Sequence, residues 1–228
     1  MKPAMPPFSL SVVIPVYSGE HHLRALVEAL AGLRDAWAQA DAPIALDEAI
    51  LVDDSALDGS PALADALARE YPFVSVLHLS RNFGQHAATV AGILHSSGDW
   101  VVTMDEDLQH PPSRIPLLLA RAVAEGSDVV YARPSGGVHE TAVRDLSSRA
   151  FKRLTEWATG NPHIRNVNSF RLMRGPVARA AGSVCGHDTF FDVALSWFTR
   201  RVGSVGMELK DERTIRGGRS GYRLRSLL

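Results

Sequence analysis

Apolar segments that suit buried strands alternate with longer segments that suit helices through the first half of this 228-residue chain. The strand-like segments are residues 10–16, 48–52, 74–79 and 100–104, and the helix-like segments are residues 20–40, 60–71 and 85–96. Near-continuous apolar strands are typical of sheets covered on both faces, and repeated β-α-β units imply parallel strands with right-handed crossovers. The sequence therefore predicts an α/β protein with a mostly parallel sheet and helices on both faces.

The second half of the chain follows this alternation less closely. Its predicted elements are a helix from about Ser113, a strand over residues 128–131, a loop over 133–140 and a helix over 143–158. Because no linker or change of composition marks a boundary, we predict a single domain over residues 1–228.

The chain has no apolar run of roughly eighteen residues, the length that a membrane-spanning helix needs. Its first residues do not form a signal peptide. A single cysteine, Cys185, cannot make an internal disulfide and fits a reducing compartment. We therefore expect a cytoplasmic protein.

The net charge of -1 conceals opposite charges on the two halves. Residues 1–112 carry 15 acidic and 5 basic side chains, whereas residues 113–228 carry 10 acidic and 19 basic side chains. Mixed surface charge often serves only solubility. Alternatively, the acidic half holds a cation while arginines of the basic half bind phosphate oxygens.

Three consecutive carboxylates, Asp105, Glu106 and Asp107, follow the apolar segment 100–104 directly. The carboxyl edge of an open α/β sheet is where ligands bind, and Mg²⁺ is commonly held there by one or two carboxylates plus water and substrate phosphates. A solvated acidic turn is the simpler alternative. The motif alone leaves both interpretations open, and the cation interpretation would also imply a phosphorylated substrate.

The other strands end in polar residues too. Tyr17 and Glu20 follow the first strand, and Asp53 and Asp54 end the second. The ends of parallel strands lie at one edge of the sheet, so these carboxylates should lie close together. Carboxylates at close range repel each other unless a cation neutralises them or ligand groups donate hydrogen bonds. After the third strand, the segment from Arg81 opens a helix whose first amides either accept an anion or form an ordinary capped turn.

Several longer motifs are spread over nearly the whole chain. They are Pro15-x-Tyr17, Val52-Asp53-Asp54-Ser55-x-x-Asp58-Gly59, Arg81-Asn82-x-Gly84, Ser97-Gly98-Asp99, Asp105-x-Asp107-Leu108-Gln109-His110-Pro111-Pro112, Ser169-Phe170-Arg171-Leu172, Thr199-Arg200-Arg201-Val202-Gly203 and Arg213-x-x-x-Gly217-x-x-Ser220-Gly221-Tyr222. Together they resemble glycosyltransferase family 2, and within it the polyprenyl-phosphate glycosyltransferases, the branch of dolichol-phosphate mannosyltransferase.

This resemblance implies a GT-A fold with a single Rossmann-like sheet. It also implies inverting, metal-dependent transfer of a sugar from a nucleotide diphosphate sugar to a polyprenyl phosphate. Residues 1–112 would form the nucleotide- and metal-binding half, and residues 113–228 the acceptor-binding half.

The resemblance also assigns residues to roles. The nucleotide-sugar site would comprise Pro15, Tyr17, Glu20, Asp53, Asp54, Arg81, Gly84, Asp105 and Glu106. The Mg²⁺ or Mn²⁺ ligands would be Asp105, Asp107 and Gln109. The phosphate or acceptor site would comprise Arg133, Arg144, Ser148, Arg213 and Ser220. The catalytic set would be Asp107, Arg144, Arg213 and Asp188. Arg171 either joins the phosphate site or is a structural ion-pair partner.

The acceptor decides whether the reaction needs a general base. A hydroxyl acceptor must lose a proton to a placed carboxylate, whereas a phosphate monoester, with a second pKa near 6, is already mostly a dianion. Asp188 and Asp192 are the candidate bases, but Asp188 also suits the cap of a helix ending at Arg200, and Asp192 suits that helix's dipole. The sequence therefore mildly favours a phosphate acceptor.

Three departures from the family pattern affect the donor and acceptor assignments. Ser18 replaces a frequent Asn, Glu106 replaces a small residue, and the segment before Phe170 lacks a frequent Asp. The chain ends where membrane-bound relatives begin their transmembrane helices, so it is either a catalytic domain without its anchor or a naturally soluble member.

For a naturally soluble member, we expect peripheral contact with the cytoplasmic face of a membrane through the residues around Tyr222 and Leu224. Two alternative functions remain: the same donor chemistry with a soluble hydroxyl acceptor, and a catalytically silent sugar-nucleotide-binding protein. We expect no nucleic-acid partner.

Overall fold

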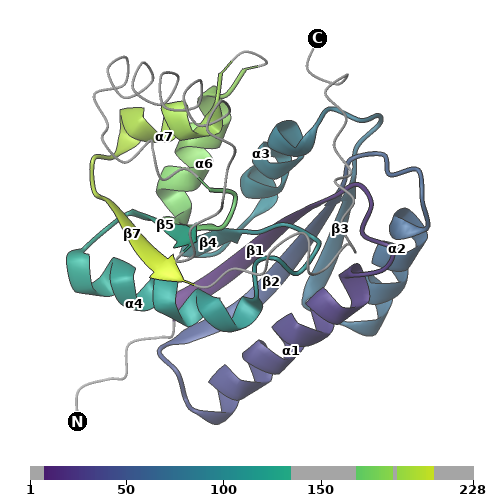
Figure 1. Cartoon of the computed structure of the whole chain (residues 1–228), viewed down its shortest axis with the longest axis horizontal. Helices are drawn as coiled ribbons and strands as arrows, with labels where there is room; N and C mark the ends of the chain where they lie inside the picture. The colour runs from purple at the N-terminus through teal and green to yellow at the C-terminus, as the bar shows by residue number, and fades with distance from the viewer. Residues whose placement is uncertain (1–7, 135–167, 187–188, 208–228) are drawn as a thin grey trace, which may run out of the picture.

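The computed structural model describes residues 8–134, 168–186 and 189–207. These residues form one seven-stranded sheet in the order β3-β2-β1-β4-β6-β5-β7 (Figure 1). The strands are β1 (Phe8–Val16), β2 (Ile44–Asp53), β3 (Val74–His78), β4 (Trp100–Thr103), β5 (Val129–Pro134), β6 (Arg171–Arg174) and β7 (Val202–Met207). Among these strands only β6 is antiparallel to its neighbours. The predicted α/β class with a mostly parallel sheet is confirmed.

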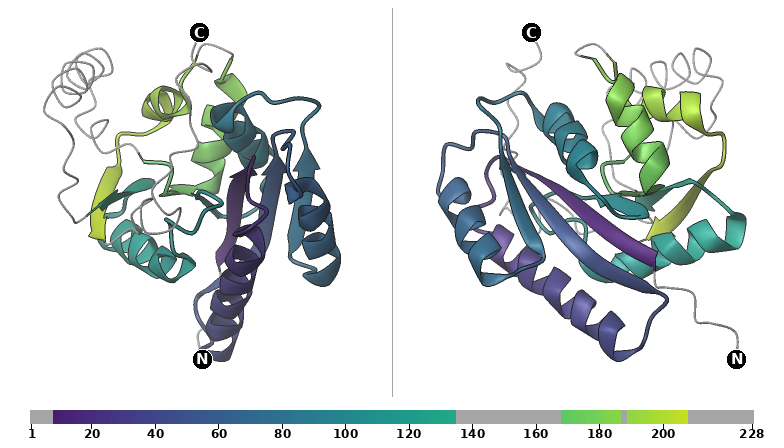
Figure 2. Two further views of the ribbon diagram at one scale, coloured as in Figure 1. Left: turned by 45° about the vertical axis from the view of Figure 1, so that its right-hand side comes forward. Right: turned by 180° about the vertical axis from the view of Figure 1, so that it is seen from behind.

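Helices cover both faces of the sheet, as predicted (Figures 1 and 2). One face carries α1 (Leu23–Gln39), α2 (Ser60–Glu70) and α4 (Ile115–Glu125), with the short 3-10 helix η1 (Pro112–Arg114) before α4. The other face carries α3 (Gln85–His95), α6 (Gly175–Val184) and α7 (Phe191–Phe198). Each group of helices buries its own cluster of apolar side chains against the sheet.

Strand β1 shows why the apolar segments are nearly continuous. Val12 and Ile14 pack into the cluster under α1, α2 and α4, whereas Val13 packs into the cluster under α3, α6 and α7. All three side chains are fully buried because successive residues of a strand point to opposite faces. Gly92 in α3 lies so close to Val13 that any larger side chain would collide with it.

The structure corrects several predicted boundaries. Helix α1 begins at Leu23 instead of residue 20, because residues before it form a turn. The helix predicted to end at Arg200 ends at Phe198 and has Phe190 as its N-cap, so Asp188 is not the cap residue. Strands β6 and β7 and helix α6 were not predicted. The helix predicted over residues 143–158 lies outside the described residues.

The buried carboxylate of Asp128 joins the start of β5 to the segment before β7. It accepts hydrogen bonds from Thr199 Oγ1 (2.6 Å) and from Nε and Nη2 of Arg201 (2.9 and 2.8 Å). Burial opposes ionisation of this group, but these donors outweigh burial and lower the pKa of Asp128. Within the described residues, no helix has both the length and the apolarity to cross a bilayer.

Candidate functional site

The carboxyl ends of β1, β2 and β4 meet at one edge of the sheet. Val16 pairs with Asp53, and the amides of Asp54 and Met104 donate to the carbonyls of Val16 (2.9 Å) and Val13 (3.1 Å). This edge gathers acidic side chains that we call the carboxylate rim. They are Asp53, Asp54, Asp58, Asp105, Glu106 and Asp107.

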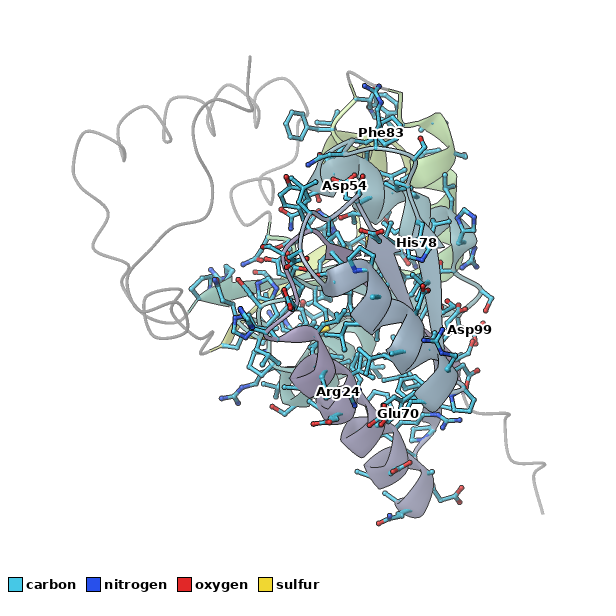
Figure 3. All side chains as sticks on the ribbon, turned by 90° about the vertical axis from the view of Figure 1, so that its right-hand side faces the viewer. Arg24, Asp54, Glu70, His78, Phe83 and Asp99 are labelled. Carbon is cyan, nitrogen blue, oxygen red and sulfur yellow. The ribbon has the colours of Figure 1, made fainter. Side chains whose placement is uncertain are left out.

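Asp54 fixes the loop that precedes α3. Its Oδ1 accepts from the Phe83 amide (2.7 Å) and its Oδ2 from the Gly84 amide (2.8 Å), and Figure 3 shows Asp54 and Phe83 at the same end of the molecule. Gly84 has φ +91°, a conformation that favours glycine. Arg81 lies 4.5 Å from the ring centre of Phe83. Asp54, whose pKa burial raises, thus binds the amides of Phe83 and Gly84 directly before α3.

Asp53 is also engaged by groups of the protein. Its Oδ1 accepts from the Ala56 amide (2.8 Å), and its Oδ2 lies 2.8 Å from Nδ1 of His78. The other ring nitrogen of His78 lies 3.1 Å from Asp65. Hydrogen bonds to Asp53, and then to Asp65, raise the pKa of His78. Asp53 therefore orders the loop after β2 and links it to β3.

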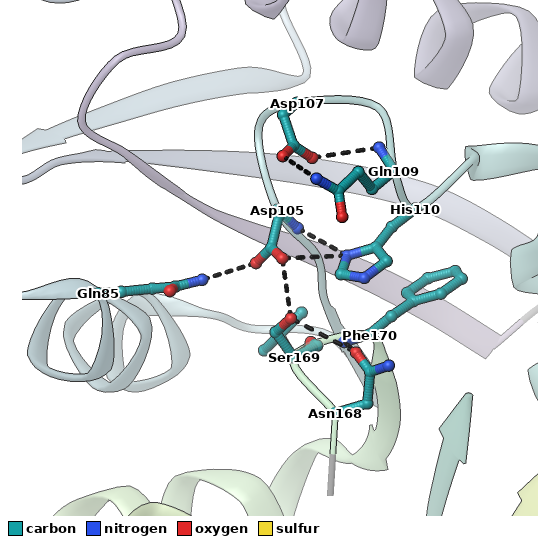
Figure 4. Close-up of polar contacts among 9 residues, drawn as sticks. Gln85, Asp105, Asp107, Gln109, His110, Asn168, Ser169 and Phe170 are labelled. Atoms are coloured by element: carbon teal, nitrogen blue, oxygen red, sulfur yellow. Dashed lines mark hydrogen bonds and ion pairs between the residues drawn. The ribbon is translucent and has the colours of Figure 1, made fainter. Parts of the chain in front are cut away.

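Asp105 lies in a network of side chains (Figure 4). Its Oδ1 accepts from Nε2 of Gln85 (2.6 Å), and its Oδ2 accepts from the Ser169 hydroxyl (2.9 Å). The Asp105 amide donates to Nδ1 of His110 (3.1 Å), whose ring stacks on Phe170 with centroids 5.0 Å apart. Burial lowers the pKa of His110, which fits a neutral ring accepting at Nδ1.

Asp107 and Gln109 are paired, as Figure 4 shows. The Gln109 amide donates to Oδ1 of Asp107 (3.1 Å), and the Gln109 side-chain nitrogen donates to Oδ2 (2.8 Å). The side-chain oxygen of Gln109 remains as an acceptor. Within the described chain, no three His, Cys, Asp or Glu side chains converge as a metal site. Two carboxylates and an amide oxygen nevertheless fit a hard cation that takes its other ligands from water and a diphosphate.

Glu106, between Asp105 and Asp107, points to the loop after β1 and not into solvent. Its Oε2 accepts from the Tyr17 amide and its Oε1 from the Ser18 amide, both at 3.0 Å. Burial raises the pKa of Glu106 despite these two donors. The third carboxylate of the motif therefore connects the loop after β4 to the loop after β1.

The repulsion expected among the rim carboxylates is relieved largely by the backbone. Asp53, Asp54 and Glu106 each accept backbone amide hydrogens, and Asp58 does so from Ser60 (3.0 Å). For these four residues, amides of the protein therefore supply the hydrogen bonds that were expected from a ligand, and no cation is needed. A cation remains a hypothesis for Asp105 and Asp107.

Arg171 is a structural ion-pair partner, one of its two predicted roles. Its Nη1 lies 2.6 Å from Oδ1 of Asp192, and both side chains are largely buried. The Tyr131 hydroxyl donates to the same oxygen (2.7 Å). Asp192, in the first turn of α7, is thus held by one partner from β6 and one from β5.

The remaining predicted residues divide into two groups. Pro15 is a buried residue of β1 paired with Val52, Glu20 accepts from the Gly59 amide (3.1 Å), and Arg133 is exposed at the end of β5. Other predicted residues lie outside the described part of the chain. They are Arg144, Ser148, Asp188, Arg213 and Ser220.

Sequence reasoning missed the side chains that support the rim. Gln85 and Ser169 contact Asp105, although they lie 20 and 64 residues away from it in the sequence. Gln85 directly follows the Arg81 motif and Ser169 opens the Phe170 motif, so one signal lay beside a motif and the other within one. Only the folded topology shows that they meet at one carboxylate.

Sequence comparisons give this site a family context. The pattern of glycosyl transferase family 2 matches residues 11–182. The undecaprenyl-phosphate 4-deoxy-4-formamido-L-arabinose transferase of Salmonella choleraesuis (strain SC-B67) is 33% identical over 208 residues, covering 89% of this chain and 60% of that protein. The same transferase from Salmonella paratyphi B gives the same values. The chain thus spans about 60% of the length of these curated relatives.

Solved structures share the fold at low sequence identity. Mannosyl-3-phosphoglycerate synthase from Rubrobacter xylanophilus has a TM-score of 0.64 at 15% identity, covering 96% of this chain and 69% of its own. Glucosyl-3-phosphoglycerate synthase from Mycobacterium tuberculosis, in complex with Mn²⁺ and uridine-diphosphate-glucose, has a TM-score of 0.61 at 18% identity, covering 98% and 75%. The predicted GT-A fold is confirmed.

Proposed function

The chain belongs to glycosyl transferase family 2, and we propose that it transfers a sugar, with inversion, from a nucleotide diphosphate sugar to a polyprenyl phosphate in a reaction that requires Mg²⁺ or Mn²⁺. The observation that carries this proposal is the oxygen-rich set of Asp105, Asp107 and Gln109 at the carboxyl edge of the sheet. The similarity to undecaprenyl-phosphate transferases supports the acceptor.

In this proposal, residues 1–112 bind the donor. Tyr17 is exposed beside the rim and would contact the nucleoside. Asp105, Asp107 and Gln109 would hold the cation, which would orient the diphosphate and neutralise the charge of the leaving nucleotide. Gln85 and Ser169 fix the orientation of the Asp105 carboxylate through hydrogen bonds to its two oxygens. A solved protein of the same fold binds Mn²⁺ and uridine-diphosphate-glucose, which supports a divalent cation beside a nucleotide sugar.

A phosphate acceptor fits the chemistry of the second half. Asp192, one of the two candidate bases, is committed to Arg171 and Tyr131. A phosphate dianion attacks without a base, so the protein need only bind its charge and exclude water. Arg133, exposed at the end of β5, would belong to this acceptor-binding half, and the acceptor's lipid would bring the protein to the cytoplasmic face of the membrane.

A panel of nucleotide sugars, assayed for released nucleotide diphosphate with and without undecaprenyl phosphate, tests this function. We expect release that depends on undecaprenyl phosphate, is abolished by EDTA, is restored by Mn²⁺ or Mg²⁺, and falls at least about a hundredfold in Asp107→Asn. The control Asp99→Asn alters a carboxylate at the opposite end of β4. Activity with soluble hydroxyl acceptors alone would refute the lipid acceptor, and full EDTA resistance would refute the metal.

A further inference from the structure

We propose that Glu106 is a positioning residue for the donor: its carboxylate locks the loop after β1 (residues 17–20) onto the loop after β4 (residues 105–109). This inference rests on the proposed function, because it assigns the two loops to the two ends of one nucleotide diphosphate sugar. Its geometric part, the lock itself, stands on contacts that can be tested separately.

The contacts of Glu106 are directional. Each carboxylate oxygen accepts from a different, consecutive backbone amide, Oε2 from Tyr17 and Oε1 from Ser18, at 3.0 Å. The Ser18 hydroxyl lies 3.5 Å from the same Oε1. Two bonds to neighbouring amides fix both the distance and the angle between the loops, which a single contact would not do.

Gly19 is what allows this approach. A Cβ atom built on Gly19 would lie 2.6 Å from Oε2 of Glu106, closer than such atoms come in real proteins. The atom in the way belongs to the end of a flexible side chain, so a methyl group at Gly19 would displace the carboxylate and leave the backbone in place. Gly19→Ala should therefore disrupt the same lock as removal of Glu106.

The loop after β1 is held from its other side as well. Oε2 of Glu20 accepts from the Gly59 amide (3.1 Å), and the Glu20 amide lies 3.4 Å from Oδ2 of Asp58. Loss of Glu106 would leave the loop attached to the β2 side alone. The loop would remain folded, but its position relative to Asp105 and Asp107 would no longer be fixed.

That position matters because the donor would contact both loops at once. Its nucleoside would lie beside Tyr17, and its diphosphate beside the cation at Asp105 and Asp107. A site whose two halves are already spaced for the ligand binds more tightly, because no ordering cost falls on the binding step. Glu106 should therefore affect donor affinity much more than the rate of the chemical step.

The first measurement is steady-state kinetics with the most active nucleotide sugar of the panel. We expect Glu106→Ala to raise KM for the donor about tenfold, which corresponds to about 1.4 kcal/mol, with kcat changed less than about threefold. Glu106→Gln keeps one acceptor oxygen, so its donor KM should lie between those of the wild type and Glu106→Ala. Calorimetric titration of UDP or GDP with Mn²⁺ should show the same ranking of dissociation constants.

Asp99 provides a matched control on the same two strands. Its Oδ2 accepts from the amide (2.9 Å) and hydroxyl (3.0 Å) of Ser9, joining β1 to β4 at their amino ends, and Figure 3 shows it well away from Asp54 and Phe83. Asp99→Ala should leave the donor KM unchanged. Glu106→Ala should accelerate hydrogen exchange at the amides of Tyr17 and Ser18, and Asp99→Ala should accelerate it at the amide of Ser9.

A double-mutant cycle distinguishes the lock from a general loss of structure. Gly19→Ala should raise the donor KM about tenfold in the wild-type background but less than about twofold in Glu106→Ala. Additive effects, or a wild-type donor KM in Glu106→Ala, would overturn this inference while the proposed function stands. If the wild-type protein releases no nucleotide diphosphate, the proposed function fails and the donor role of Glu106 fails with it.

Discussion

Asp192 offers a direct test of whether this protein needs a general base. The hydroxyl-acceptor alternative makes Asp188 or Asp192 essential for proton removal, whereas the structure places Asp192 in a buried ion pair. Its Oδ1 lies 2.6 Å from Nη1 of Arg171 and accepts from the Tyr131 hydroxyl at 2.7 Å. We therefore predict that Asp192→Ala reduces stability and has only a secondary effect on catalysis.

The size of the effect follows from the burial of the pair. The Arg171 side chain is 6% exposed and that of Asp192 13%, so water cannot replace the lost carboxylate. Removing one partner of such a pair costs about 3–5 kcal/mol, because the other charge stays buried without compensation. Folded domains are stable by only about 5–15 kcal/mol, so this loss should be plain in urea unfolding.

The double variant Arg171→Met/Asp192→Leu separates a broken pair from a lost side chain. Replacing both charges with apolar groups should recover most of the stability, with a coupling energy of about 3 kcal/mol. Donor turnover with undecaprenyl phosphate should stay within about tenfold of wild type at a temperature where all variants are folded. If Asp192→Ala had the urea unfolding midpoint of the wild type but a greatly reduced kcat, this reasoning would be refuted and a role of Asp192 as general base would be favoured.

Three further predictions follow from contacts of the described residues. The lowered pKa of Asp128 stabilises the fold at pH values above about 3.9, the pKa of an unfolded aspartate, and this stability is lost as the pH falls through the lower pKa of the folded state. In urea unfolding, Asp128→Asn should therefore reduce the dependence of the unfolding free energy on pH in the acid range. The hydrogen bond to Asp53 is the largest cause of the raised pKa of His78, which stabilises the fold below about pH 6.5; this stability is lost as the pH rises through the raised pKa. His78→Gln should abolish that loss, and an unchanged dependence of the unfolding free energy on pH would contradict the assignment. Gln85→Leu removes a donor to Asp105 and should weaken Mn²⁺-dependent binding of UDP or GDP about tenfold by calorimetry, whereas equal affinity would argue against a supporting role.

The part of the fold built from regular β-α-β units could be predicted from the sequence. Its strands are covered on both faces, so each reads as a nearly continuous apolar run, and the alternation with amphipathic helices gives the order of elements. Strand β6 was missed because its four residues, Arg171–Arg174, begin and end with arginine. Arg171 is buried there beside Asp192, 21 residues later, whose carboxylate neutralises it.

The location of the site could be predicted from the sequence, but the roles of its individual carboxylates were harder to predict. The strand ends identified Asp53, Asp54, Asp105 and Asp107 because parallel strands share a carboxyl edge. The sequence did not show which carboxylates hold loops, because the partners of Asp54 and Glu106 are backbone amides. Every non-proline residue carries an amide, so no residue type signals such a contact.

This difference in partners suggests which carboxylates are available to a cation. Asp54 and Glu106 accept from backbone amides of other loops, so a metal that took their oxygens would also displace those loops. Both oxygens of Asp105 accept from side chains, Gln85 and Ser169, which can adjust to a bound cation while still holding the carboxylate, because each oxygen keeps a further lone pair. Asp107 accepts from Gln109 of its own loop, at Oδ1 from the backbone amide and at Oδ2 from the side chain. A cation held by Asp105, with Asp107 and Gln109 beside it, would therefore leave the loop contacts of Asp54 and Glu106 in place, which supports this set as the metal ligands.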